Sequence, residues 1–300
     1  MNLFYREVAA ALFAAALFST TLWANAQGTR ASLWSTEITG DASFLGSGSV
    51  ANRKLEFNSI SEIESSAGVV FTRQITDTLQ FRVGGEYQIY SFDTKTPTPI
   101  PDVIQGANLV VGANFNIGQA ILARIDAKPG FYGEFSHLNL NYFNVPFDVG
   151  ATYFVSADFQ LIAGFEVNLN RRYFLFPTAG VYWRMANKWV LNGVLPRPQL
   201  EYSPTDKLTF HLGADFGGST FRMNNNFGSE TGNKKLNNAI LDYMEVRTGA
   251  GMTWQAHKNL KIDIEAGCVP YRRFDYNRAS FKLTSDDVVP YVRIGLTSDF

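Results

Sequence analysis

The sequence predicts an all-β protein that forms a single transmembrane antiparallel β-barrel of about 12 strands, with a range of 10–14. Two observations lead to this prediction. Apolar and polar residues alternate along much of the chain in stretches of about ten residues, as strands with one apolar and one polar face require. The connections between these stretches alternate between short turns and longer polar loops. Barrels whose two rims face different compartments have this arrangement.

The chain begins with a predicted export signal. A basic residue, Arg6, precedes the apolar stretch Val8–Phe18, and the small residues Ala24 and Ala26 flank Asn25 as in a signal-peptidase site. We expect cleavage there, because the apolar stretch is short for a membrane-anchoring helix. The predicted organisation is a signal peptide over 1–26, an N-terminal lead-in or first strand over 27–50, and the β-barrel over 51–300.

The composition narrows the possible functions. The net charge of −1 indicates no partnership with nucleic acid, and the single cysteine, Cys268, excludes an intramolecular disulfide. The 25 Phe and 13 Tyr suit the aromatic girdles of a barrel. The longest uncharged stretch of the mature chain, Val103–Ala123, contains amides and glycines and alternates like a strand. No cofactor is expected.

Turn signals set the strand number. Six short turns at one rim, with both termini at the same rim, predict fourteen strands. A cramped hairpin around Pro196 and Pro198 reduces the count to the favoured twelve. The short turns lie near Thr76–Thr78, Ile117–Gln119, Ser156–Asp158, Met185–Lys188, Pro204–Asp206 and Ala256–Asn259.

Longer connections are expected at the opposite rim. They are predicted over 91–102, 134–147, 222–238 and 271–287. The segment Tyr271–Tyr276 combines aromatic and basic residues. It suits an upper girdle with snorkelling arginines, or contact with lipopolysaccharide phosphates.

The polar face of the strands is the candidate functional region. It carries both signs of charge, which suits either the lining of a channel or a lattice of ion pairs that fills a narrow barrel, and the lattice is favoured because inward polar groups need partners. The candidate lumen-lining residues are Arg82, Glu86, Glu166, Asp215, Glu245, Arg247, Asp263, Glu265 and Arg293.

A catalytic function has less support in the sequence. Only three histidines occur, and His211 and Asp215 share a strand face about 13 Å apart, too far for a direct pair. His137 lies in a predicted loop and His257 in a predicted short turn. The sequence therefore indicates no catalytic residues, no metal ligands and no enzyme.

The last strand resembles the C-terminal assembly signal of bacterial outer-membrane proteins. Val292, Ile294 and Leu296 alternate with polar residues, and the chain ends at Phe300. This resemblance implies that the outer-membrane insertion machinery and outer-membrane lipid are partners.

The pattern over Leu195–Tyr202, Gly213–Gly218 and the last strand resembles bacterial outer-membrane barrel families of unknown function. The expected function is a passive channel for small solutes or a structural membrane protein. The alternatives are a surface-binding, adhesin-like barrel that acts through its long loops and, less favoured, an outer-membrane hydrolase.

Overall fold

The computed structural model describes residues 34–52, 55–94, 98–135, 139–285 and 287–300. The predicted signal peptide and its cleavage site lie outside these residues, as does His137. The described part of the predicted segment 27–50 belongs to the first strand, β1 (Trp34–Ala51).

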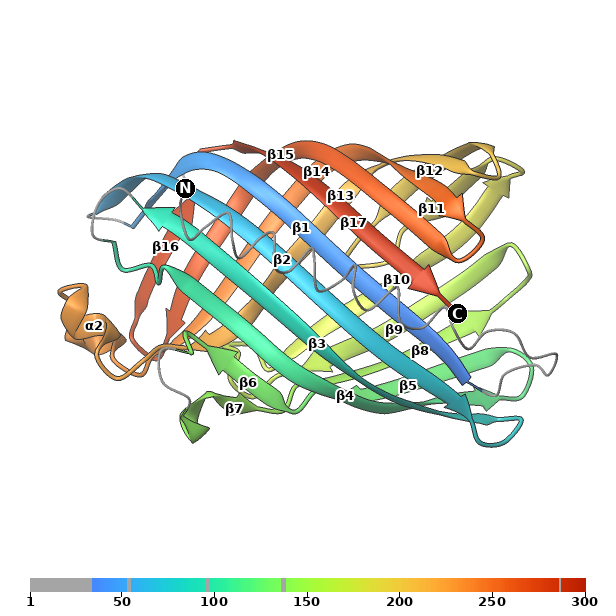
Figure 1. Cartoon of the computed structure of the whole chain (residues 1–300), viewed down its shortest axis with the longest axis horizontal. Coiled ribbons are helices and arrows are strands. Elements are labelled where there is room, and N and C mark those ends of the chain that lie inside the picture. Colours follow the sequence, from blue (N-terminus) through green and yellow to red (C-terminus); the bar gives the residue numbers. More distant parts are fainter. Residues whose placement is uncertain (1–33, 53–54, 95–97, 136–138, 286) are drawn as a thin grey trace.

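Seventeen strand segments form one antiparallel sheet that closes on itself, apart from a single parallel bridge (Figure 1). The sheet closes because β1 pairs with β2 on one edge and with β17 on the other, from Glu37 opposite Asp299 to Leu45 opposite Tyr291. The segments are β1 (Trp34–Ala51), β2 (Glu56–Gln74), β3 (Leu79–Thr94), β4 (Val103–Ile117), β5 (Ile121–Ala127), β6 (Gly130–Gly133), β7 (Phe143–Asn144), β8 (Phe147–Phe154), β9 (Phe159–Val167), β10 (Leu175–Ala186), β11 (Trp189–Asn192), β12 (Gln199–Thr205), β13 (Leu208–Arg222), β14 (Ile240–His257), β15 (Leu260–Asn277), β16 (Phe281–Ser285) and β17 (Val289–Asp299). Three short helices, η2 (Leu140–Tyr142), α2 (Phe227–Glu230) and η3 (Lys234–Leu236), lie in the loops.

The barrel has fourteen strands, because three of them are interrupted and are each drawn as two segments, β5–β6, β7–β8 and β16–β17. The favoured count of twelve was therefore wrong, although fourteen lies within the expected range. The two strands that the count of twelve left out are β11 and β12, which form the hairpin around Pro196. β11 has only four residues, yet it pairs with β10 on one side and with β12 on the other.

The six predicted short turns all connect strands at one end of the barrel, which we name the short-turn end. The C-terminus lies at this end, on the right in Figure 1. The opposite end, the long-loop end, carries α2, η2 and η3. One predicted loop was wrong. Residues 271–277 continue β15, because Arg272, Phe274 and Tyr276 point inward and are buried.

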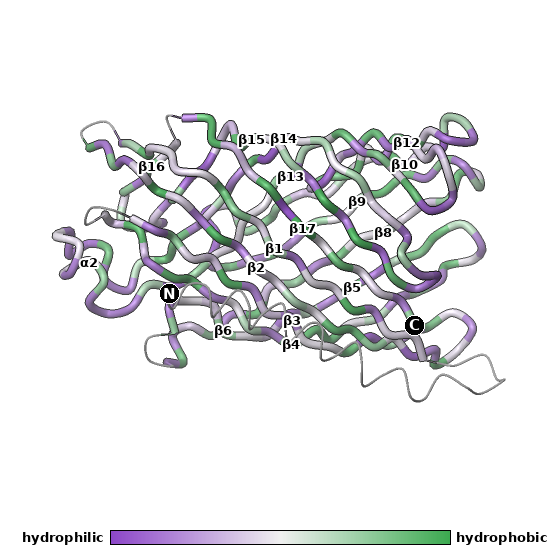
Figure 2. The backbone as a smooth tube through the Cα atoms, turned by 45° about the horizontal axis from the view of Figure 1, so that its top comes forward, coloured by the Kyte–Doolittle hydropathy of each residue, from purple (hydrophilic) through white to green (hydrophobic). Residues whose placement is uncertain are grey.

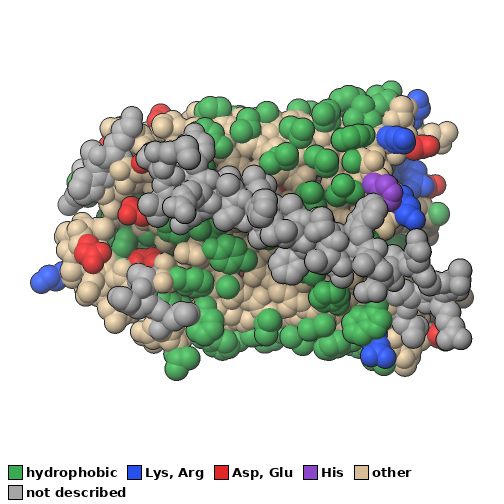
Figure 3. All heavy atoms as spheres, viewed as in Figure 1, with side chains coloured by type: hydrophobic (Ala, Val, Ile, Leu, Met, Phe, Trp, Pro, Cys, Tyr) green, Lys and Arg blue, Asp and Glu red, His purple; other side chains and the backbone are tan. Residues whose placement is uncertain are grey.

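Hydropathy alternates along each strand (Figure 2). One face of most strands exposes large apolar side chains, such as Phe81, Phe165, Phe210 and Ile264. In Figure 3 such side chains cover the middle of the barrel, and most charged side chains in this view lie towards the two ends. Among the described residues, no helix is long and apolar enough to cross a membrane.

The long-loop half of the barrel is filled by an apolar core. Inward-facing aromatic rings pack edge to face, as Tyr90 does on Tyr243 with centroids 5.3 Å apart and Phe92 does on Phe274 with the same separation. The members of this core come from residues 50–132 and 221–283. The strands β7 to β12, which we name the side panel, lie between these two ranges.

The side panel is bypassed at the long-loop end. There, β13 forms a single parallel bridge with β6, between Arg222 and Gly133. Because β6 is an antiparallel neighbour of β4, this bridge closes a smaller ring around the apolar core. The side panel lies outside this smaller ring and widens the rest of the barrel.

Candidate functional site

All nine predicted lumen residues form ion pairs in the structure. The partners lie on the same strand, on a nearby strand or in an adjoining connection, so these pairs run along the inner face of the wall. The pairs are Arg82 with Asp126 (3.1 Å), Glu86 with Lys128 (3.3 Å), Glu166 with Arg171 (2.9 Å), Asp215 with Arg197 (3.7 Å), Glu245 with Arg247, Asp263 with Arg293 (3.2 Å) and Glu265 with Arg197 (2.8 Å).

Arg247 lies at the centre of one cluster. Its guanidinium on β14 contacts the carboxylates of Glu245 on its own strand and Glu64 on β2. β2 and β14 are separated by β15, β17 and β1. The contact between Arg247 and Glu64 therefore crosses the interior, just below the apolar core.

A second cross-barrel pair was missed by the sequence reasoning. Arg272 on β15 contacts Glu62 on β2 at 3.3 Å, and the Tyr243 hydroxyl lies 2.5 Å from the same carboxylate. Both charged side chains are almost fully buried. Arg272 had been expected at the surface, either in a girdle or on a lipopolysaccharide phosphate. Alternation gives the face on which Glu62 lies, but it does not reveal which distant strand supplies the partner.

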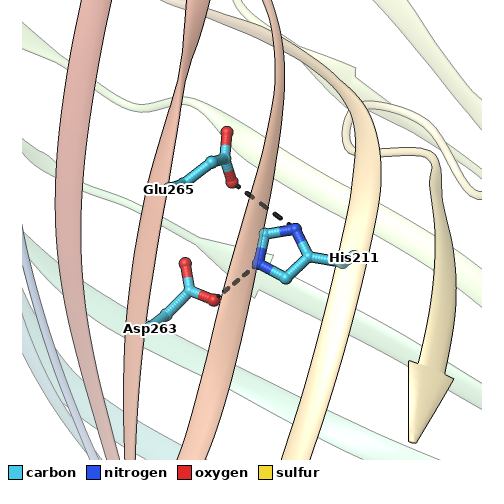
Figure 4. Close-up of side chains that lie close together, drawn as sticks. All are labelled: His211, Asp263 and Glu265. Atoms are coloured by element: carbon cyan, nitrogen blue, oxygen red, sulfur yellow. Dashed lines mark hydrogen bonds and ion pairs between the residues drawn. The ribbon is translucent and has the colours of Figure 1, made fainter.

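His211, Asp263 and Glu265 form the third cluster (Figure 4). Imidazole Nε2 lies 2.9 Å from Asp263 Oδ2, whereas Nδ1 lies 3.8 Å from Glu265 Oε2. His211 thus pairs with a carboxylate two strands away, not with Asp215 on its own strand.

This third cluster does not fit a metal ion. The two carboxylates approach opposite nitrogens of one ring, whereas a metal ion is bound by a single imidazole nitrogen. The carboxylates also already accept hydrogen bonds from Arg197, Arg293, Thr253 and Tyr291. The cluster is a network of hydrogen bonds and ion pairs.

Open space remains beside the side panel. A cavity of about 810 Å³ lies between the inner faces of β5, β8, β9 and β10 and the strands β13 and β14. Gly150 and Gly164 create part of this space. A Cβ at Gly164 would lie 2.5 Å from the Val149 carbonyl oxygen, so this position requires glycine, whereas a Cβ at Gly150 would make only ordinary contacts, the nearest at 3.5 Å.

The closed antiparallel sheet, the apolar outer surface and the paired charges inside define a porin-like β-barrel. The profile of a family described as "Domain of unknown function (DUF6268)" matches residues 72–288, more than half of the chain. The chain belongs to this family, which confirms the expected resemblance to barrel families of unknown function. No curated protein matches the sequence.

Several solved outer-membrane barrels are similar in outline. The COG4313 outer membrane channel from Pseudomonas putida F1 is 8% identical, with a TM-score of 0.47 over 88% of this chain and 95% of that one. The KdgM porin in complex with disordered oligogalacturonate is 10% identical, with a TM-score of 0.36 over 87% and 99%. A Pseudomonas aeruginosa FadL homologue is 9% identical, with a TM-score of 0.36 over 89% and 90%. These likenesses are too distant to support an argument about function.

Proposed function

We propose that this protein is a passive channel of the bacterial outer membrane that admits small solutes to the cavity beside its side panel. The observation that supports this most is the cavity of about 810 Å³ inside a barrel whose outer surface is apolar. Short turns face the periplasm in barrels of this kind, so we assign the short-turn end to that side. The long-loop end then faces outward, and the apolar core that fills it directs solutes to the cavity beside the side panel.

The proposal includes the ends of the chain. Residues 1–26 are a signal peptide that is removed on export, residues 27–50 lead into or form the first strand, and 51–300 form the remainder of the barrel. The C-terminal strand, closed by Phe300, is the segment that the insertion machinery recognises. N-terminal sequencing of the membrane-extracted protein should therefore find Gln27 at or near the start, and a retained Met1 would overturn the export assignment.

Conductance across a planar bilayer tests the channel. We expect small, steady current steps, because the apolar core fills the long-loop half and the open space lies beside the side panel. Those of the nine candidate residues that are partly exposed, such as Glu86 and Glu166, then form a charged wall beside water and solute. A refolded barrel that stays electrically silent in repeated insertions would remove the channel from consideration and leave a structural role.

Catalysis and surface binding have weaker support. His211 bonds to the Asp263 carboxylate through Nε2, and its Nδ1 faces the Glu265 carboxylate at 3.8 Å, whereas a hydrolase of the expected type needs a nucleophilic hydroxyl at one of these nitrogens. Surface binding through the segment 271–276 has less support, because Arg272 is buried against Glu62 and is not available to a ligand at the surface. We therefore propose that the protein is not an enzyme.

A further inference from the structure

The wall of the barrel is incomplete between β10 and β13. The last pair that joins β13 to β12 is Gln199 opposite Gly213. Beyond it, Ala214 and Phe216 donate backbone hydrogen bonds to the carbonyl groups of Pro198 and Pro196, at 3.0 Å each. The next contact on this edge is the single bridge at Arg222. Within the described residues, 217–221 thus have a strand partner only on the β14 side.

The cavity of about 810 Å³ reaches this unpaired edge, because Pro196, Gly217 and Gly218 line it. Gly150 also lines it and points into the barrel. Met244 lines it from the outer face of β14, because its neighbours Tyr243 and Glu245 reach residues in the interior. Asp242 has the same orientation as Met244, yet it is buried and paired with Arg171 in the loop between β9 and β10. The cavity therefore lies between the inner face of the side panel and the outer face of β14.

Ion pairs bound this unpaired edge on the long-loop side. Arg171, in the loop between β9 and β10, contacts Glu166 on one side of the gap at 2.9 Å and Asp242 on the other at 3.5 Å. Its guanidinium also lies over the Phe176 ring at 5.2 Å. Pro196 bounds the opposite side. The unpaired edge is therefore flanked by defined contacts on both sides.

The lining of the cavity indicates its ligand. Apolar side chains and glycine backbone form much of the wall, including Leu122, Ile162, Phe176 and Met244. The cavity volume falls in the range of about 300–1,000 Å³ that holds small organic molecules. Most charged groups in the wall are neutralised, as Asp148 is by Lys128 and Asp242 is by Arg273.

Arg124 is the exception. Its Nε donates to Asn114 Oδ1 at 2.8 Å, and no carboxylate of the described residues lies within ion-pair distance of its guanidinium. The side chain is exposed to the space inside the barrel. A guanidinium with two free nitrogens offers paired donors that match a carboxylate.

We propose that this cavity binds a small amphiphile with one carboxylate on an apolar body, and that Arg124 holds the carboxylate. The proposal rests on the proposed function, because it names the class of solute that the channel would accept. The apolar body would lie along Ile162 and Phe176, with its far end towards Met244.

Equilibrium dialysis of radiolabelled octanoate and 1-octanol tests the proposal, with the barrel in phosphatidylcholine nanodiscs and empty nanodiscs subtracted. We expect octanoate to bind more tightly than octanol. The Arg124→Gln variant should weaken octanoate binding about tenfold, the size of one charged hydrogen bond, and leave octanol unchanged. Equal affinity of the parent for both probes, or an octanoate affinity that ignores Arg124→Gln, would overturn the carboxylate site.

A second variant tests the cavity itself. Gly150→Leu places a side chain in the cavity and should weaken both probes at least about fivefold, because it removes volume that the apolar body needs. Its control is Gly85→Leu. Gly85 faces outward, opposite in orientation to Arg82 and Glu86 on the same strand, and a Cβ there would come no closer than 3.6 Å to any neighbour. Unchanged binding in Gly150→Leu would overturn the proposal. Conductance distinguishes the channel proposal from the carboxylate-site proposal. A barrel that conducts ions but binds no octanoate would support the channel and overturn the site.

Discussion

Arg272 and Glu62 form an ion pair at 3.3 Å although two strands, β17 and β1, separate their own strands in the sheet. The Arg272 guanidinium also donates to the Ile60 carbonyl oxygen, again at 3.3 Å. Each charge has lost its water, so each depends on the other. The pair therefore fixes the spacing between β15 and β2 directly beneath the apolar core.

Breaking this pair should destabilise the barrel strongly. Glu62→Gln and Arg272→Met each leave one buried charge without a partner, which costs about 3–5 kcal/mol. Denaturant unfolding in phospholipid vesicles measures the change. The matched control is Arg184→Gln, which breaks an exposed pair with Asp158 and should cost less than about 1 kcal/mol. Equal losses in all three variants would contradict a buried pair.

Outer and inner positions should differ in their tolerance of charge. Phe165 is 43% exposed on the outer surface, whereas Thr152 lines the cavity. Phe165→Arg should lower the free energy of unfolding in lipid by about 2–4 kcal/mol, because a charge at the centre of the lipid face is costly. Thr152→Arg should be tolerated far better. Similar unfolding midpoints for both variants would mean that the two faces are wrongly assigned.

Phe300 should matter for assembly. Its backbone N–H donates to the Thr36 carbonyl oxygen and its own carbonyl accepts from Thr36, both at 2.9 Å, so it completes the ladder that closes the barrel. Deletion of Phe300 should reduce the folded fraction, seen as heat-modifiable mobility on a detergent gel, without reducing export. Phe300→Tyr keeps the ring and the ladder and is the control. An undiminished folded fraction after the deletion would count against the signal.

Two arginines should affect ion flow differently. Arg124 is open to the cavity, whereas Arg247 is 4% exposed and paired with two carboxylates. Arg124→Gln should shift ion selectivity towards cations, because it removes a positive charge from the water-filled space. Arg247→Gln should lower stability with little change in selectivity. Reversal potentials in a salt gradient provide the measurement, and a selectivity shift in Arg247→Gln alone would reverse this assignment.

The loop before β17 should respond to pH. Asp287 accepts hydrogen bonds from the Ser49 hydroxyl at 2.7 Å and from the Ser49 backbone N–H at 2.9 Å, and these bonds hold the pKa of Asp287 below its ordinary value. A depressed carboxyl pKa stabilises the folded state above the ordinary Asp pKa of about 3.9, and the stabilisation is lost as the pH falls through the folded-state pKa. Ser49→Ala should raise the pKa of Asp287, as NMR titration would show. An unchanged value would contradict the contact.

The sequence predicted the class of fold, all six short turns and the charged face, because each depends on local chemistry. Gly118, for example, adopts a φ of +64° in its turn, a conformation that glycine favours. The strand count failed at β11, where four residues are too few for alternation to be recognised. The sequence also did not predict which residues of distant strands contact each other. Alternation indicates which face of its own strand each of Glu62 and Arg272 occupies. Their contact, however, depends on closure of the barrel, which brings β2 and β15 close together.

Because β6 and β13 form a bridge with each other, the side panel is not part of the ring that encloses the apolar core. The aromatic core draws on residues 50–132 and 221–283, so the hairpins between these ranges can change length or sequence without disturbing it. The shape of the inner chamber can thus vary independently of the core that fills the long-loop half.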